Sequence, residues 1–365
     1  MKRSLRCTLA LGAVITVSAG CTATDPVGPE PITTAATTPS PTPPGDRGGD
    51  GALIYLLQVG STQGVPLTTG SSPVWSPDGA RIAFSSKRTG VYDLYVIDRD
   101  GSGLARLTHD GVSQEPNWSP DGRRIAWISE GSLNVMNSDG TNQITLARST
   151  PLFSKLRMGA WSPDGRTLAF ADPADGNIHL AIADGSGVLT LPFSGAAPIA
   201  VFQRPTWSPE GKRIAFVAVS ACSASATSYC IGIHVMPAQG GAATLLAGNE
   251  TEDDERPIWS PDGSRIAFLT YPGGDCGYWC DRPNLPELHV MNADGTGRRQ
   301  LATGVVTWPA WSADGNTVIV STSDSTSNGA RMVAMPATGG PAQLLASSAG
   351  VMSPDGRWIA LGAAR

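Results

Sequence analysis

The sequence predicts an all-β protein in which one four-stranded unit is repeated around a ring. Glycine (43) and proline (29) make up about a fifth of the 365 residues, against roughly an eighth in average usage. Hydrophobic residues reach 41%, enough for a large core, whereas charged residues reach 16%, below the roughly 25% of ordinary domains. The motif Trp-Ser-Pro-Asp-Gly recurs at nearly regular intervals, which indicates a repeat architecture rather than long helices.

The repeated motif ends one strand and begins a tight turn. Proline presets φ, aspartate hydrogen-bonds the local backbone, and glycine accepts a positive φ. Six copies begin at tryptophan and a seventh at methionine, 41 to 52 residues apart: Trp75, Trp118, Trp161, Trp207, Trp259, Trp311 and Met352.

Each repeat contains four short strands, as the first copy shows. After the strand that ends at Trp75, apolar runs follow at 81–84 and 94–97, a second turn at 98–101 and a last strand at 105–108. Four antiparallel strands in 40–50 residues are typical of a blade of a β-propeller.

The blade count follows from the chain ends. Six complete units begin at the six tryptophans, whereas 349–364 holds only a first and second strand. Residues 53–69 form a third and fourth strand with no preceding pair. We therefore expect a seven-bladed β-propeller over 52–365, in which the N-terminal strands complete the C-terminal blade and remove the free edges.

These repeats resemble the β-propeller repeats of the TolB family. The resemblance rests on Trp-Ser-Pro-Asp-Gly, the apolar second strand, third strands such as His289-Val290-Met291 and the Asp-Gly turns, and it covers about 52–365. It implies the fold and a tendency toward protein interaction. TolB itself carries an additional α/β domain ahead of its propeller, where this chain has a different N-terminal segment, so a Tol-Pal role does not carry over.

The first fifty residues have the layout of an export signal and a tether. Lys2, Arg3 and Arg6 precede an apolar run over 7–20, which predicts a signal peptide over 1–20. Small residues before Cys21 resemble a bacterial lipoprotein signal, with Cys21 as the lipidated residue, although position 18 is serine rather than the usual leucine. The Pro/Thr-rich segment 21–51 is then a tether, and the protein is exported and lipid-anchored on the extracytoplasmic side of a bacterial membrane. An ordinary secretory signal with a coincidental cysteine is the alternative.

The sequence offers no recognisable catalytic constellation. It has no Gly-x-Ser-x-Gly, P-loop or dinucleotide fingerprint, and its net charge of -5 argues against nucleic acid as a partner. His179, His234 and His289 occupy one repeat position in three different blades, so we expect packing residues rather than a metal site. The motif aspartates, such as Asp78, are expected to be turn residues. We predict no catalytic residue, metal or cofactor.

A candidate binding site lies three residues before each motif tryptophan, at the entry to the innermost strand. Side chains at this position should surround the mouth of the central channel, and four of them would form a polar, aromatic-walled site: Glu115, Arg204, Arg256 and Trp308. The alternative is a solvated rim whose charges pair with one another.

Insertions in two neighbouring blades should gather on one sector of the same face. The 2–3 loops at 219–230 and 270–286 and the acidic 4–1 loop at 250–255 carry further candidate binding residues: Asp253, Asp254, Tyr278 and Trp279. Export predicts disulfides among Cys222, Cys230, Cys276 and Cys280. Local pairs 222–230 and 276–280 are preferred, because each closes an inserted loop. Cross-blade pairs and a zinc site are the alternatives.

The predicted function is a non-catalytic binding platform, a monomer that recognises a protein or a cell-envelope glycan. The alternative is a carbohydrate-active enzyme, a lyase or hydrolase with its site at the channel mouth, because some TolB-like propellers are pectin-fragment lyases with metal-binding histidines near the centre. A third hypothesis is a sensor or assembly factor of the envelope.

Overall fold

The computed structural model describes residues 53–61, 63–148, 157–172, 175–194, 200–201, 205–221, 229–248, 252–272, 285–324 and 329–361. All of them belong to one compact unit, Gly45–Arg365. No helix in these ranges has the length and apolar character needed to cross a membrane. The predicted signal peptide, tether and Cys21 lie outside the described residues.

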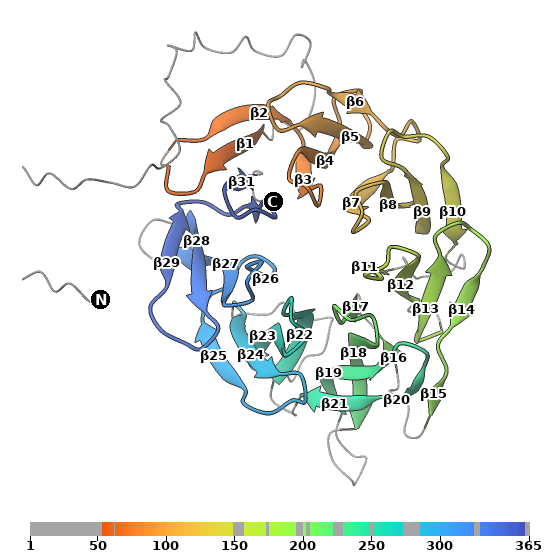
Figure 1. Cartoon of the computed structure of the whole chain (residues 1–365), viewed down its shortest axis with the longest axis vertical. Helices are drawn as coiled ribbons and strands as arrows, with labels where there is room; N and C mark the ends of the chain where they lie inside the picture. Colours follow the sequence, from red (N-terminus) through yellow and green to blue (C-terminus); the bar gives the residue numbers. More distant parts are fainter. Residues whose placement is uncertain are drawn as a thin grey trace, which may run out of the picture. The chain divides into compact units, whose positions relative to one another are not determined.

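Seven antiparallel sheets stand around a central axis, and the first strand of each blade lies innermost (Figure 1). The predicted seven-bladed β-propeller is confirmed. Blade 1 consists of β3 (Ser71–Trp75), β4 (Arg81–Ser86), β5 (Asp93–Asp98) and β6 (Ala105–Arg106). Blade 2 consists of β7 (Gln114–Trp118), β8 (Arg124–Ser129), β9 (Ser132–Asn137) and β10 (Ile144–Ala147). Blade 3 consists of β11 (Arg157–Trp161), β12 (Thr167–Asp172), β13 (Asn177–Ile182) and β14 (Val188–Thr190).

Blades 4 to 6 follow the same order with longer second strands, and blades 4 and 6 also have longer third strands. In blade 4 two short segments take the place of the inner strand, and both pair with its second strand. Blade 4 consists of β16 (Ala200–Val201), β17 (Thr206–Trp207), β18 (Arg213–Ala221), β19 (Tyr229–Pro237) and β21 (Thr244–Ala247). Blade 5 consists of β22 (Glu252–Trp259), β23 (Arg265–Pro272), β24 (Glu287–Asn292) and β25 (Arg299–Ala302). Blade 6 consists of β26 (Ala310–Trp311), β27 (Thr317–Asp324), β28 (Gly329–Pro336) and β29 (Gln343–Ala346). A separate parallel pair links β15 (Phe193–Ser194) to β20 (Gly241–Ala242).

The two ends of the propeller meet in one closing blade. Its sheet runs in the order β2 (Val65–Thr69), β1 (Leu53–Gln58), β31 (Trp358–Leu361) and β30 (Val351–Met352). β1 pairs antiparallel with β31, from Tyr55 opposite Leu361 to Gln58 opposite Trp358. The prediction that N-terminal strands complete the C-terminal blade is therefore confirmed.

The repeated turn is held by its serine and aspartate. In blade 1 the Ser76 hydroxyl donates to Asp78 Oδ1 at 2.6 Å and accepts from the Arg81 amide at 2.9 Å. The Ala80 amide also donates to Asp78 at 3.0 Å, and Gly79 has φ 67°. The Ser76 hydrogen bond is the main reason that the pKa of Asp78 is lowered. The motif aspartate is therefore a turn residue, as the sequence predicts.

Each motif tryptophan joins its blade to the preceding one. Its indole N–H donates to the carbonyl just before the corresponding residue of that blade, at 3.0 to 3.3 Å: Trp75 to Val351, Trp118 to Val74, Trp161 to Asn117, Trp207 to Ala160, Trp259 to Thr206 and Trp311 to Ile258. Four of the rings also lie under an arginine of the preceding blade, namely Trp118, Trp161, Trp259 and Trp311. Methionine has no N–H to donate, so Met352 cannot form this bond between the closing blade and blade 6.

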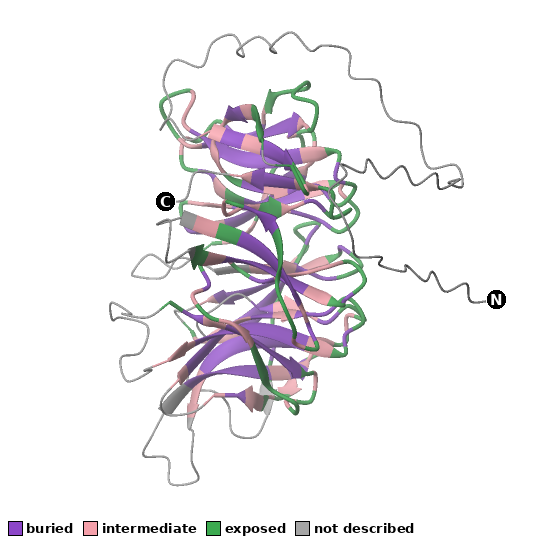
Figure 2. Cartoon of the chain, turned by 90° about the vertical axis from the view of Figure 1, so that its left-hand side faces the viewer, coloured by how far each residue is buried: buried purple, intermediate pink, exposed green. Residues whose placement is uncertain are grey.

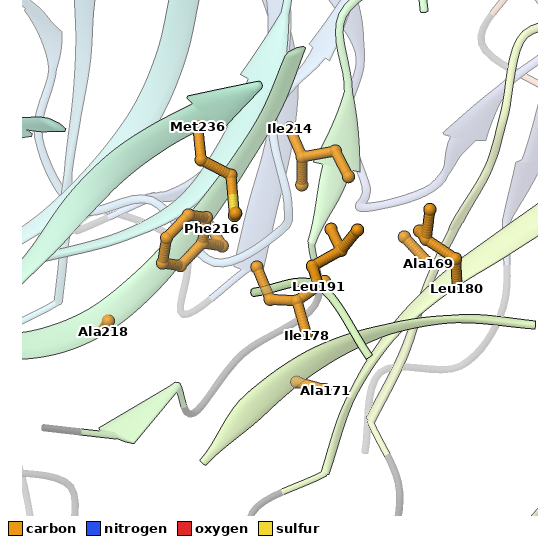
Figure 3. Packing of buried hydrophobic residues seen from close by; sticks show 9 residues of the cluster. All are labelled: Ala169, Ala171, Ile178, Leu180, Leu191, Ile214, Phe216, Ala218 and Met236. Carbon is orange, nitrogen blue, oxygen red and sulfur yellow. The ribbon is translucent and has the colours of Figure 1, made fainter. Parts of the chain in front are cut away.

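The core consists of apolar layers between neighbouring blades, and burial is concentrated in the middle of the strands (Figure 2). Between blades 3 and 4, Ile178, Leu191, Ile214 and Phe216 are fully buried and pack with Met236 (Figure 3). Both faces of a blade are thus covered, which accounts for the low share of charged residues.

The inserted segments hold more strand than the sequence predicts. At the expected loop 219–230, β18 and β19 still pair as far as Ala221 opposite Tyr229. At the expected loop 270–286, β23 continues to Pro272, which lies opposite Glu252. The extension of β18 pairs with β19, whereas the extension of β23 pairs with the inner strand β22, so the backbone groups of both extensions find partners within their own blades.

Candidate functional site

The predicted channel-mouth position has an unusual backbone. Ser72, Glu115 and Arg256 have φ between 53° and 57°, in the left-handed region that residues other than glycine rarely adopt. The pairing with the second strand shifts at the same point, between Ser71 and Val74, between Gln114 and Asn117, and between Glu255 and Ile258. A bulge at this point re-aims the side chain at the entry of the innermost strand. Strained residues of this kind cluster at functional sites.

Two of the predicted mouth residues, on neighbouring blades, come into contact. The Arg256 guanidinium of blade 5 lies over the indole of Trp308, which precedes β26 of blade 6, at 4.6 Å from the ring centroid. Trp308 is 49% exposed although it is among the largest apolar side chains. Among the described residues the Arg256 guanidinium has no hydrogen-bond or ion-pair partner. Glu115 belongs to blade 2, and Arg204 lies outside the described residues.

A pocket of about 310 Å³ lies beside this pair, between blades 5 and 6. Its deepest lining residues, Leu269 and Val305, are 2% and 1% exposed and belong to the apolar layer between the two blades. Arg256 and Tyr271 also line it, and the remaining lining residues are Leu285, Pro286, Val306 and Thr307. Leu285 and Val306 are 48% and 43% exposed, so apolar surface continues from the pocket onto the face of the propeller.

The prediction of an exposed acidic loop is wrong for residues 252–255. These residues form the first half of β22, and Asp253, Asp254 and Glu255 are 5%, 0% and 3% exposed. Asp253 and Asp254 therefore do not offer their carboxylates to solvent as the loop prediction assumed. The strand can hold this charge because each carboxylate has a partner.

Asp254 is the centre of a buried polar network in blade 5. It accepts from Thr270 Oγ1 at 2.6 Å and from Nη1 and Nη2 of Arg298 at 3.1 Å each. Arg298 also donates to Glu252 at 3.0 Å and, through Nε, to Nδ1 of His289 at 3.3 Å. The network ties the innermost strand to the residue just before the outermost strand, β25. Burial is the largest influence on Asp254 and raises its pKa to about 6.

The network and the pocket lie on opposite faces of blade 5. Thr270 follows Phe268 by two residues, and Phe268 packs with blade 4 residues in one apolar cluster. Leu269 packs with blade 6 residues in another cluster and lines the pocket. The Asp254 carboxylate therefore faces blade 4, whereas Arg256 closes a pocket that faces blade 6.

The third-strand histidines pack against phenylalanines of the second strands. Ring centroids lie 5.1 Å apart for Phe170 and His179, 5.6 Å for Phe216 and His234, and 5.6 Å for Phe268 and His289. In blade 1 Tyr95 takes the same place against Phe84 at 5.8 Å. Burial lowers the pKa of His234 and His289 and favours the neutral ring. In the described part of the chain no three His, Cys, Asp or Glu side chains are grouped as metal ligands.

Several predicted site residues cannot be placed. Cys222, Cys276, Cys280, Tyr278 and Trp279 lie outside the described residues, and Cys230 is placed only as part of β19. Tyr271 belongs to the candidate loop 270–286 and lines the pocket, whereas nothing in the sequence singles out Leu285 and Val306. Their signal is weak, because a partly exposed apolar residue at a strand end is common.

Comparisons with known proteins agree with this architecture. The model of the TolB beta propeller domain matches residues 52–132 and 129–359. Similar curated proteins are the uncharacterized peptidase YuxL of Bacillus subtilis strain 168 (31% identical over 123 residues, 33% of this chain and 17% of YuxL) and the Tol-Pal system protein TolB of Anaeromyxobacter dehalogenans strain 2CP-C (32% over 113 residues, 30% and 22%). The uncharacterized protein Atu1656 of Agrobacterium fabrum strain C58 is 33% identical over 230 residues, 60% of this chain and 62% of Atu1656. The chain thus covers less than two thirds of each of these relatives.

Solved structures show the same fold at low identity. An oligogalacturonate lyase in complex with manganese has a TM-score of 0.61 at 14% identity and covers 85% of this chain and 96% of its own. The hydrazine synthase of Kuenenia stuttgartiensis has a TM-score of 0.56 at 14% identity, with 79% and 91% covered. At this identity the likeness concerns the fold alone. Because the family model matches most of the sequence, the chain belongs to the TolB beta propeller domain family.

Proposed function

We propose that this protein is an exported, lipid-anchored propeller that acts as a non-catalytic binding platform for a protein or a cell-envelope glycan. Cys21 is the proposed lipidated residue, and 21–51 is the tether that holds the propeller away from the membrane. The proposed contact surface is the channel mouth at blades 5 and 6.

The arginine–tryptophan pair at the mouth is the observation that carries the proposal. Arg256 keeps a left-handed backbone and lies over Trp308, which leaves half of a large indole open to solvent. Arginine, tryptophan and tyrosine are enriched among the residues that dominate binding energy, and Tyr271 lines the adjacent pocket. Glu115, Arg204, Tyr278 and Trp279 are proposed as further contact residues.

Crosslinking in the native envelope tests the proposal. A photo-crosslinking amino acid at position 307, beside the pair, should capture a discrete partner in the native chain. Trp308→Ala should remove that capture, because truncation of a central anchor costs about 2 kcal/mol or more of binding energy. Leu189→Ala is the matched control, because Leu189 is also exposed (56%) but lies on the outer strand β14 of blade 3. Equal capture by both variants would remove the site assignment.

The competing hypothesis, a carbohydrate-active enzyme, requires its own measurement. Incubating the protein with pectin fragments and other envelope or plant glycans, with and without divalent metals, should leave them uncleaved if the platform proposal is right. Shortened products that disappear in Arg256→Asn would instead assign chemistry to the mouth.

The lipid anchor is tested separately from binding. Metabolic labelling with a clickable fatty acid should mark the wild-type chain and leave Cys21→Ser unlabelled. Label in both proteins would remove Cys21 as the acylated residue.

A further inference from the structure

The pocket between blades 5 and 6 combines an apolar floor with one cation at its mouth. Leu269 and Val305 form the buried floor, and Arg256 is the charged residue among the eight that line it. Hydroxyl groups come from Tyr271 and Thr307. A ligand that fills this site must therefore be largely apolar, with an anionic group at one end.

In the described part of the chain, none of the nearby carboxylates forms an ion pair with Arg256, although Asp253 and Glu255 lie opposite Tyr271 and Leu269 in the strand register. Glu252 and Asp254 are paired with Arg298 on the face of blade 5 that packs against blade 4. Asp253 and Glu255 are buried, have interactions of their own and are not among the pocket-lining residues. In the described part of the chain the Arg256 guanidinium, with its planar fork of donors, makes no hydrogen bond.

We propose that this pocket binds a small carboxylic acid with an apolar or aromatic tail. The carboxylate pairs with Arg256, the tail lies over Leu269 and Val305, and the Trp308 indole covers one side of the guanidinium. The site shares Arg256 and Trp308 with the proposed contact surface but does not depend on it, because a small ligand needs only the pocket.

Size and polarity together select this class of ligand. A volume of about 310 Å³ lies at the low end of small-molecule sites, which suits one ring or a short chain. A saccharide would bring many hydroxyls to a wall with few polar partners, and each unpaired polar group costs binding energy. A carboxylate beside guanidinium forms a charge-assisted hydrogen bond, which is stronger than a neutral one.

Titration calorimetry on the full-length protein tests the proposal with three probes. 3-Phenylpropanoate carries both the charge and the ring, 3-phenylpropanamide has the same shape without the charge, and propanoate has the charge without the ring. We expect the acid to bind about tenfold more tightly than the amide, the gain typical of a hydrogen bond to a charged group. Propanoate should bind more weakly than 3-phenylpropanoate.

Two variants tie the selectivity to Arg256. Asparagine tolerates the left-handed backbone, so Arg256→Asn should remove the preference for the acid without disturbing the bulge. Val306→Asp places a negative charge on an exposed lining residue and should weaken binding of the acid several-fold more than binding of the amide. Unchanged melting temperatures verify that both variants are folded.

Several results would overturn the proposal. The first is equal affinity of the wild type for the acid and the amide. The second is an unchanged ratio of these two affinities in Arg256→Asn. The third is an equal loss of affinity for the acid and the amide in Val306→Asp. A pentapeptide ending in phenylalanine that binds more than tenfold better than the free acid would reassign the pocket to a peptide C-terminus. Loss of envelope crosslinking with intact acid selectivity would refute the binding platform and leave the acid site standing.

Discussion

The indole hydrogen bonds between blades predict a specific and measurable loss of stability in Trp161→Phe. Trp161 is 6% exposed, and its Nε1 donates to the Asn117 carbonyl of blade 2 at 3.1 Å. Phenylalanine keeps a ring beneath Arg124, which lies 5.2 Å from the Trp161 ring centroid. The substitution therefore removes the hydrogen bond and the pyrrole part of the side chain while keeping most of the aromatic contact.

The expected loss can be divided into two parts. Leaving the partly buried Asn117 carbonyl without this donor costs about 1–3 kcal/mol. Removing the buried pyrrole atoms costs about 1 kcal/mol more, at roughly 0.8 kcal/mol per methylene-sized group. The sum, about 3 kcal/mol, corresponds to a melting temperature about 4–5 °C lower for a propeller of this length.

Urea unfolding followed by circular dichroism measures this loss. Met352→Leu is the matched control, because Met352 occupies the same repeat position with no N–H to lose, and a volume-conserving swap costs less than about 1.5 kcal/mol. If the two variants lose the same stability, the indole hydrogen bond does not join the blades as we infer.

Three further predictions concern closure and charge. Deleting 353–365 removes β31, the partner of β1, and should unfold the propeller cooperatively; calorimetry would contradict this if the melting profile stayed unchanged. Met352→Trp supplies the missing donor toward blade 6 and should raise the free energy of unfolding by about 1 kcal/mol in urea titrations, whereas a loss would mean that the indole does not fit. Asp254 has its folded-state pKa raised from 3.8 to about 6, so the folded chain binds this proton more tightly. The stability that this protonated carboxyl contributes is fully present below about pH 4 and is lost as the pH rises through 6. Asp254→Asn should therefore remove this pH dependence of the free energy of unfolding, measured between about pH 4 and 7. An unchanged pH dependence in the variant would refute the role of Asp254.

The repeat pattern predicts most of the fold because each motif residue acts within its own turn or on the next blade. Ser76, Asp78 and Gly79 form a local turn, and equal spacing of the tryptophans fixes the number of blades. Closure follows by counting strands at the two ends. The contact between Arg256 and Trp308 is likewise foreseeable, since they hold one repeat position in adjacent blades.

The acidic run at 252–255 shows where such reasoning fails. Five acidic residues in the six of 250–255 predict a solvated loop when only neighbours along the chain are considered. The burial of Asp254 depends on Arg298, more than 40 residues away, which reaches across the blade to its carboxylate. No local signal distinguishes such a partner from any other arginine, so the buried strand and its network had to be seen in the structure.

The closing blade makes folding depend on the order in which the chain is made. β1 and β31 lie about 300 residues apart, and closing so long a loop costs only about 1.7 kcal/mol more than closing one of 45 residues. This free-energy cost is small at equilibrium, but closure of the ring is slow. β1 and β2 are synthesised first and cannot pair until the final strand has been made. Until then β1 and the C-terminal half-blade expose complementary edges. Two unfinished rings can therefore exchange β1 and β2, so we expect a strand-swapped dimer to be the characteristic misfolded product at high concentration.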